Sequence, residues 1–182
     1  MTILVGLIDT ENEQVILASD RMASFGSHTL HSPVTKIIDF DFMAIAGCGA
    51  VRGLNIIEAY LNPPIPSQGE DAYQYCITQL VPSLQDTFAN AHYTDFSPSG
   101  GMQSKTNGLL VAIDSRLFEI GEDYSVVEYT DFVCAGSGMT YAYGALFSCQ
   151  SLELDVPAED KIIVAIHAAA QFDKNCGEDI SY

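Results

Sequence analysis

Runs of apolar residues alternate with short polar turns along the first fifty positions of the chain. Four of these runs are short and continuous, which predicts strands at residues 2–8, 14–20, 34–40 and 42–49. A polar turn, TENE, separates the first two, and a short acidic turn separates the last two, so we expect two hairpins. Continuous apolar strands are typical of a sheet that is covered on both faces.

The apolar spacing becomes helical after residue 50. It predicts one helix over residues 51–61, which the segment NPPIPSQGED ends, and a second over residues 73–88. Pro82 lies inside the second helix, and because proline lacks an N–H group we expect it to kink or divide that helix. The segment TDFSPSGGMQSKT that follows is expected to be a loop.

Strands return at residues 107–114, 116–121 and 124–136, and a further helix is expected to begin near Met139. A last helix is predicted over residues 159–172, with Pro157 near its start, and residues 179–182 suggest one more strand. Strands are thus grouped with strands and helices with helices. This order predicts two sheets packed together, with a helix pair on each outer side, in a single domain over residues 1–182.

The charge of the chain limits its partners. It carries 24 Asp and Glu but only 7 Lys and Arg, a net charge of −17, which repels phosphate backbones and anionic lipid. We therefore expect neither nucleic acid nor a membrane surface as a partner. The sequence shows no signal-peptide pattern, and its 5 cysteines include no C-x-x-C pair, so reduced, mostly buried thiols and a cytoplasmic location are expected.

The sequence motifs do not favour a metal site or a nucleotide site. His28 and His31 lie three residues apart, but no Cys or Glu cluster completes a metal site. The glycine-rich segment AGCGAVRG follows a predicted hairpin and not a βαβ unit, so a dinucleotide site is not favoured. We expect no cofactor.

Thr2 is the candidate nucleophile, because an N-terminal threonine carries its own base in the free α-amine. Such a residue needs a lysine to lower the pKa of that amine, a carboxylate to orient the lysine, and a backbone N–H for the oxyanion. Asp20, Lys36 and Gly47 on the early strands supply these parts. Each also has an ordinary structural explanation, so the residues by themselves leave both interpretations open.

At this point the sequence resembles the β-type subunits of proteasomes, within the N-terminal nucleophile (Ntn) hydrolases. The resemblance covers nearly the whole chain and rests on the segments TILVGLI, ILASDRMAS, TKI, MAIAGCGA, CAGSGMTYAYGAL and AAAQFDKNCGEDI. It implies an α+β fold, a four-layer αββα sandwich of two antiparallel sheets. It also implies Thr2 as nucleophile, with Asp20, Lys36 and Gly47 in the roles given above.

The resemblance implies further site residues. Ser137 and Asp173 would support the amine, and Cys176 stands where the family usually has a serine, so a weaker hydrogen-bond partner is expected there. An uncharged specificity pocket that favours apolar residues before the scissile bond would be lined by Ala23, Ser24, Val34, Ile45 and Gly49.

The function implied is that of a threonine endopeptidase that hydrolyses peptides or unfolded proteins inside a homo-oligomeric ring, with an ATPase unfoldase partner as in some family members. Met1 would be removed first, and the C-terminal end after the last helix is short for the family. Two alternatives stay open. One is a non-catalytic structural ring subunit of the same fold, and the other is an Ntn amidase acting on a small molecule.

Overall fold

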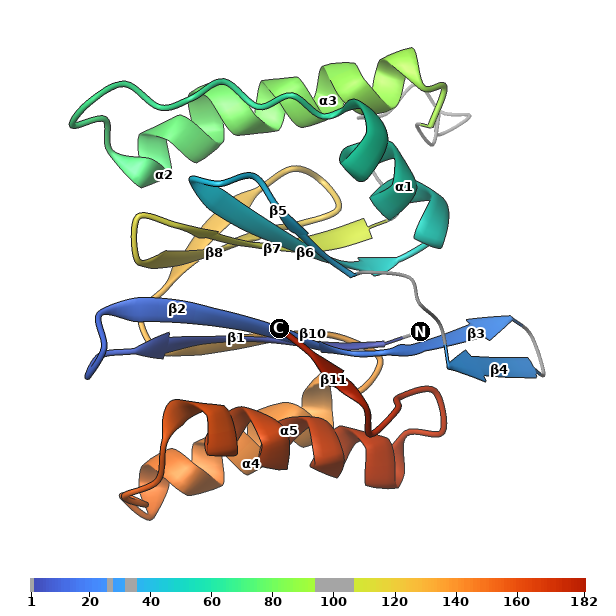
Figure 1. Cartoon of the computed structure of the whole chain (residues 1–182), viewed down its shortest axis with the longest axis vertical. Coiled ribbons are helices and arrows are strands. Elements are labelled where there is room, and N and C mark those ends of the chain that lie inside the picture. The colour runs from blue at the N-terminus through green and yellow to red at the C-terminus, as the bar shows by residue number, and fades with distance from the viewer. Residues whose placement is uncertain (1, 26–27, 32–35, 94–106) are drawn as a thin grey trace.

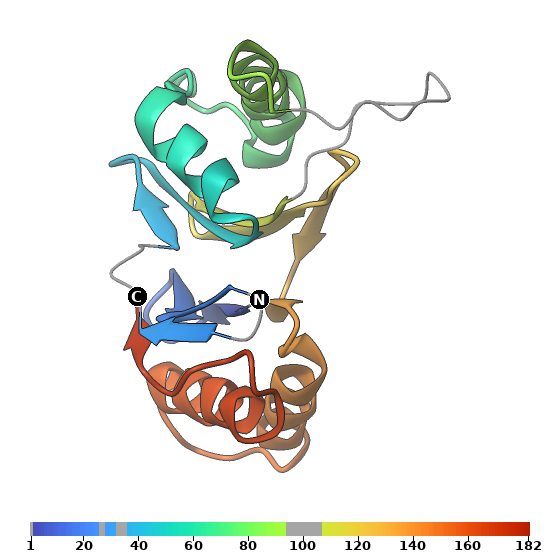
Figure 2. The same ribbon diagram turned by 90° about the vertical axis from the view of Figure 1, so that its right-hand side faces the viewer.

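The computed structural model describes residues 2–25, 28–31, 36–93 and 107–182, which form a sandwich of four layers (Figure 1). Two sheets lie face to face, and helices cover the outer face of each. Figure 2 shows the same layers after a quarter turn, with one helix group above the sheets and one below. The α+β, four-layer αββα fold expected from the sequence is confirmed.

The first sheet places the N-terminal strand between two neighbours. Its order is β10-β1-β2-β11, and its strands run antiparallel. The bounds are β1 (Ile3–Asp9), β2 (Gln14–Asp20), β10 (Phe132–Gly136) and β11 (Ile180–Ser181). Because β1 is bonded on both sides, the residue just before it is held inside the sandwich.

The second sheet has the order β5-β6-β7-β8-β9. Its strands are β5 (Ile37–Asp39), β6 (Met43–Gly49), β7 (Asn107–Ile113), β8 (Arg116–Ile120) and β9 (Val126–Tyr129). A separate two-stranded ribbon of β3 (Met22–Phe25) and β4 (His28–His31) continues from β2 and extends beyond the sandwich (Figure 1).

The helices fall into two groups. The second sheet is covered by α1 (Val51–Tyr60) and by a continuous helix made of α2 (Ala72–Tyr75), the π-helical turn η1 (Cys76–Leu80) and α3 (Val81–Asn90). The first sheet is covered by α4 (Met139–Ser151) and α5 (Ala158–Phe172). Among the described residues no helix is long and apolar enough to cross a membrane.

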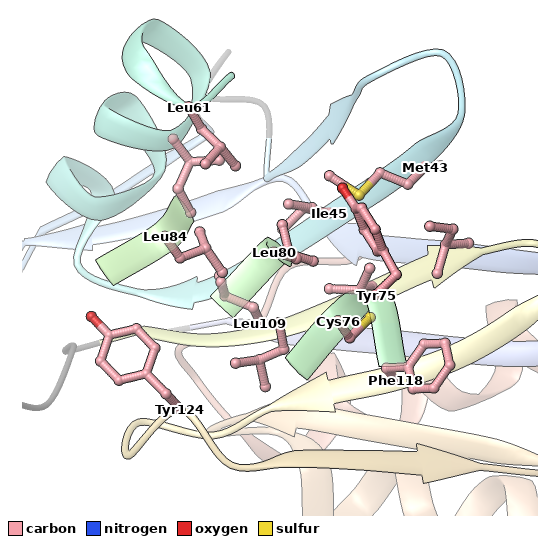
Figure 3. Close-up of a cluster of buried hydrophobic side chains, with 14 of the residues drawn as sticks. Met43, Ile45, Leu61, Tyr75, Cys76, Leu80, Leu84, Leu109, Phe118 and Tyr124 are labelled. Atoms are coloured by element: carbon pink, nitrogen blue, oxygen red, sulfur yellow. The ribbon is translucent and has the colours of Figure 1, made fainter. Parts of the chain in front are cut away.

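Apolar side chains fill all three spaces between the layers. Tyr75, Leu80 and Phe118 belong to the cluster between the second sheet and its helices, shown in Figure 3. Alternate residues of β1 serve the other two spaces, since Ile3 packs toward α4 and α5 while Leu4 packs between the sheets. This alternation explains why the run is apolar without interruption.

The predicted grouping of strands with strands and helices with helices is confirmed, including both early hairpins. Pro82 neither breaks nor ends its helix. The Val81 N–H donates to the Cys76 carbonyl, five residues back, so the chain takes a wider turn just before the proline that lacks an N–H.

Two strand predictions need correction, and one ribbon was not predicted. Residues 124–136 do not form one strand, because β9 bonds to β8 in the second sheet while β10 crosses to β1 in the first. The predicted strand over 34–40 is only Ile37–Asp39 where the structure describes it. The ribbon of β3 and β4 was not expected, because its polar and apolar residues show no clear alternation.

Candidate active site

The backbone of Thr2 is fixed by the turn that follows β10. The Thr2 carbonyl accepts from Gly138 N–H at 3.4 Å and from Ser137 Oγ at 3.5 Å. Gly136 has a φ of 98°, and a Cβ added there would lie 2.2 Å from the Thr2 carbonyl oxygen. Glycine is therefore required at this position both for its conformation and for the space it leaves.

The Thr2 side chain lies in a buried cluster with a lysine and a carboxylate. Its hydroxyl contacts both Asp20 Oδ1 and Lys36 Nζ, and the three residues are almost inaccessible to solvent. Lys36 Nζ also donates to Asp20 Oδ1 at 2.6 Å and to the Met22 carbonyl at 2.8 Å. An ammonium group has three donors, and here each has an acceptor.

Asp20 stands at the end of β2, where backbone groups from three segments converge on its carboxylate. Oδ1 accepts from Ile3 N–H at 3.0 Å, and Oδ2 accepts from Gly177 N–H at 3.0 Å and Met22 N–H at 3.3 Å. Hydrogen bonds of this kind offset the cost of burying a charged carboxylate. They also hold the carboxylate in one orientation toward Lys36.

The surroundings of Lys36 act on its pKa in opposite directions. Burial lowers the pKa of the Lys36 amine, and the neighbouring Asp20 carboxylate raises it through charge and hydrogen bonding, with a lowered value as the result. A lysine with a lowered pKa that is still paired with a carboxylate is typical of a functional site.

A second polar group lies beside the Thr2 carbonyl. Asp173 follows α5 and accepts from Asn175 and, at 3.6 Å, from Cys176 Sγ, which lies 4.0 Å from Ser137 Oγ. Burial by itself would raise the pKa of Asp173, but hydrogen bonds from Ser137, Asn175 and Cys176 lower it. Burial, together with the Asp173 charge, raises the pKa of the Cys176 thiol to about 12, so this thiol is neutral at pH 7.

Gly47 does not have the free N–H group that the oxyanion role requires. Its N–H donates to the Lys36 carbonyl at 2.9 Å, one residue beyond the paired residues Ile37 and Ala46 of β5 and β6. A Cβ added at Gly47 would lie 2.3 Å from Leu54 Cδ2. In this structure the glycine therefore lets α1 pack onto β6. Its N–H is bonded to Lys36, so its role as an oxyanion donor stays a prediction without support from this geometry.

The expected substrate-binding residues are only partly brought together. Ala23 lies in β3 next to the Met22 carbonyl that binds Lys36. Gly49 ends β6 with a φ of 112°. Ile45 is fully buried in the cluster of Figure 3, so its side chain is not exposed to a ligand. Val34, and the side chain of Ser24, lie outside what the structure describes.

Several groups of the site were not expected from the sequence, namely the Met22 carbonyl and the N–H groups of Ile3, Gly138 and Gly177. They are backbone groups, so residue type gives no direct signal for them. The glycines in GSG and NCG were the visible hint, because glycine permits a close approach of backbones. No group of three or more metal-ligating side chains occurs in the described part of the chain.

The chain is similar in sequence to known proteins. No family model matches the sequence. Proteasome subunit beta 2 of Pyrococcus abyssi is 29% identical over 98% of this chain and 84% of its own, and proteasome subunit beta 1 of Thermococcus kodakarensis is 26% identical over 92% and 78%. Both similarities run through nearly the whole of the chain.

Solved structures agree on the fold. Thiobacillus denitrificans BPH in complex with epoxomicin superposes with a TM-score of 0.82 at 20% identity, covering 99% of this chain and 96% of the other. HslV from Trypanosoma brucei gives a TM-score of 0.67 at 19% identity, with coverage of 99% and 97%.

The four-layer sandwich, with Thr2 directly before a central strand, is the fold that this chain shares with these solved structures. Together with the similarity to proteasome β subunits over almost the full length, this fold supports a proteasome β-subunit-like N-terminal nucleophile hydrolase.

Proposed function

We propose that this chain is a threonine peptidase whose nucleophile is the hydroxyl of Thr2. The observation that carries the proposal is the contact of Thr2 Oγ1 with both Lys36 Nζ and Asp20 Oδ1 inside a buried cluster. A lysine ammonium beside the hydroxyl stabilises the negative charge that develops on oxygen, and it does so more strongly away from water.

The base is the α-amine of Thr2. While Met1 is attached, the nitrogen of Thr2 is an amide and cannot accept a proton, so removal of Met1 comes first. The free amine has a reference pKa of about 7.7–8.0. The positive charge of Lys36 nearby favours the neutral, basic form of that amine.

The reaction then follows in two steps. Thr2 Oγ bonds to the carbonyl carbon of a peptide and its proton passes to the amine. The carbon–nitrogen bond breaks, the proton passes to the departing amine, and the substrate's acyl group stays on Thr2 as an ester. Water hydrolyses the ester, which releases the acid and restores the hydroxyl. Asp20 orients Lys36 throughout, while Ser137, Asp173 and Cys176 support the backbone beside the amine.

The first prediction is that only protein that lacks Met1 is active. Intact-mass measurement and a fluorogenic leucine peptide assay are made on the same preparations. We expect activity to follow the fraction that begins at Thr2, to vanish in Thr2→Ala, and to persist in Thr2→Ser, which keeps a hydroxyl. A protein similar in fold was crystallised with epoxomicin, so epoxomicin is expected to raise the Tm of processed protein but not of Thr2→Ala.

Full activity in protein that retains Met1 would contradict the mechanism. A Thr2→Ala protein that is folded and as active as the parent would exclude Thr2 as the nucleophile of the measured activity.

The proposal extends to the assembly. The relatives are named as proteasome subunits, and we propose a homo-oligomeric ring in the cytoplasm that encloses the sites and takes peptides or unfolded proteins, delivered by an ATPase unfoldase. Light scattering at micromolar concentration tests the ring, and we expect a species several times the 19.7 kDa of one chain. A stable monomer with full peptidase activity would contradict the ring.

A further inference from the structure

A cavity of about 480 Å³ lies at the end of β1 opposite to Thr2. It is bordered by the turn between β1 and β2, the start of β10, and the connection from α4 to α5, all of which lie on the side of the molecule away from the N-terminus in Figure 1. A strand rises about 3.4 Å per residue, so seven-residue β1 separates the cavity from the catalytic cluster by about 20 Å. The cavity is therefore not part of the candidate active site.

Part of the cavity lining is apolar and is fixed by the core. Leu7, Phe132 and Leu146 line it, and each of them packs in or against the core between the first sheet and its helices. One wall is the β1–β2 turn, which is fixed by Asp9. The carboxylate of Asp9 accepts from Asn12 Nδ2 at 2.7 Å and from Gln14 Nε2 at 3.2 Å. A preformed cavity of this size, with both apolar and polar lining residues, is in the range that takes a side chain or small ligand.

The rim of the cavity is acidic. Asp131, Asp155 and Glu159 line it and are exposed, and within the described residues no side-chain hydrogen bond or ion pair engages their carboxylates. Lys161 is the one cationic side chain among the lining residues that the structure describes. The rim thus presents negative charge that the chain itself leaves largely unpaired.

Apolar side chains stand exposed beside the cavity. Val156 lines it and is 39% exposed. Phe147, which is 63% exposed, lies on α4 three residues before the lining residue Gln150, and residues at this spacing are neighbours on a helix surface. Leu154, in the connection between α4 and α5, is 43% exposed. Exposed apolar side chains beside a partly apolar cavity mark an interaction site for a protein better than a site for a small ion.

The charge of the chain decides what kind of partner fits. The acidic rim favours a basic segment as its partner, and this chain, with 24 acidic and 7 basic residues, offers few basic segments. We propose that the cavity is a docking site for a segment of a different protein, in which one or two apolar side chains are flanked by Lys or Arg. The apolar side chain fills the cavity against Phe132 and Leu146, and the cations pair with Asp155 and Glu159. This proposal does not rest on peptidase activity.

The test uses two fluorescein-labelled octapeptides of equal charge, Gly-Lys-Arg-Leu-Phe-Arg-Lys-Gly and Gly-Lys-Arg-Ser-Ser-Arg-Lys-Gly. Fluorescence anisotropy is measured with full-length protein carrying Thr2→Ala, so that a threonine-dependent activity cannot cut the probe. Burial of a leucine or phenylalanine side chain favours binding about tenfold or more. We expect the first peptide to bind at least about tenfold more tightly than the second.

Two variants locate the binding. Gln150→Trp places a large side chain at the cavity and is expected to weaken binding of the first peptide about tenfold. The double variant Asp155→Asn with Glu159→Gln is expected to weaken binding of that peptide about fivefold. Glu58→Gln with Asp86→Asn, exposed positions in the other helix layer, makes the same change in charge and is expected to alter affinity less than twofold.

Equal binding of the two peptides would overturn the proposal, since the protein would then sense charge alone. So would unchanged binding in folded Gln150→Trp, or an equal loss in the control pair. Circular dichroism establishes that each variant is folded, and the measurement reads binding whether or not the chain is a peptidase.

Discussion

The hydroxyl of Thr2 is held by residues that come from separate parts of the chain. Asp20 ends β2, Lys36 precedes β5, and Thr2 itself precedes β1. Lys36 is suited to its place because its long side chain brings three donors to Thr2, Asp20 and the Met22 carbonyl at once. At the scale of single residues, the site is therefore a charge cluster in which each member satisfies the others.

Replacement of Lys36 by alanine is expected to reduce peptidase activity at least about 100-fold, because the developing charge on Thr2 Oγ loses its cation. Breaking a buried ion pair can cost about 3–5 kcal/mol, but Asp20 keeps three backbone N–H donors, so we expect a folded, less stable protein. The assay is run together with circular dichroism and thermal unfolding.

The matched control is the double variant Lys36→Met with Asp20→Asn, which removes both charges. It should recover part of the lost stability but not the activity. Near-native turnover in folded Lys36→Ala would remove lysine from the mechanism.

At the scale of elements, glycines decide how closely helices approach the sheets. Gly47 in β6 faces Leu54 of α1, and a Cβ at this position would lie 2.3 Å from Leu54 Cδ2 and 3.2 Å from Leu109 Cδ2. Leu54 is 4% exposed and has little room to move. By contrast, a Cβ at Gly144 of α4 would meet no atom within 4 Å.

The two glycines therefore predict opposite effects of the same substitution. Gly47→Ala is expected to lower the free energy of unfolding by about 1–3 kcal/mol through overpacking. Gly144→Ala is expected to raise it by about 0.5–1 kcal/mol, because alanine favours the helix and nothing opposes its methyl group. Urea unfolding of both variants against the parent protein provides the measurement. A stabilised Gly47→Ala protein would show that α1 does not pack on β6 as described.

At the scale of the whole molecule, three apolar layers bury several titratable groups far from water. None of the five cysteines, all of which lie among the described residues, forms a disulfide, and four of them are buried. Burial raises the pKa of the thiols of Cys76, Cys134 and Cys176 to about 12 each. The core therefore takes these groups only in their neutral form.

This predicts that the protein loses stability in alkali. The unfolded-state thiol has a pKa of 9.0 and the folded one about 12, so between these values the unfolded chain has released protons that the folded chain still holds. Stability then falls as pH rises, by up to about 1.4 kcal/mol per thiol and pH unit. The lowered pKa of Lys36 has the opposite effect on stability at pH values below its unfolded pKa of 10.5. Because Lys36 is one group and the thiols are three, the effect of the thiols is the larger.

Urea unfolding at pH 8 and pH 10 measures the effect. We expect a loss on the order of 3 kcal/mol between the two, with a smaller loss in Cys134→Ala, which has one thiol fewer. A free energy of unfolding that is equal or higher at pH 10 would contradict the burial of these thiols.

The sequence by itself determined most of the order of the elements and the members of the charge cluster. The spacing of apolar residues reflects which face of each strand or helix is buried. Both early hairpins, the helix pairs and the short last strand could therefore be predicted. Thr2, Asp20 and Lys36 could be found because only certain side chains supply a nucleophile, a cation and a carboxylate, and the structure brings these three together.

Only the tertiary structure decided which backbone groups are free and which surfaces are hollow. It shows that residues 124–136 divide between two sheets and that the Gly47 N–H is used by Lys36. It also places Asp131, Asp155 and Glu159 around one cavity. The physical reason is that hydrogen-bond partners and cavities depend on contacts between segments far apart in the chain, which residue type and spacing do not encode.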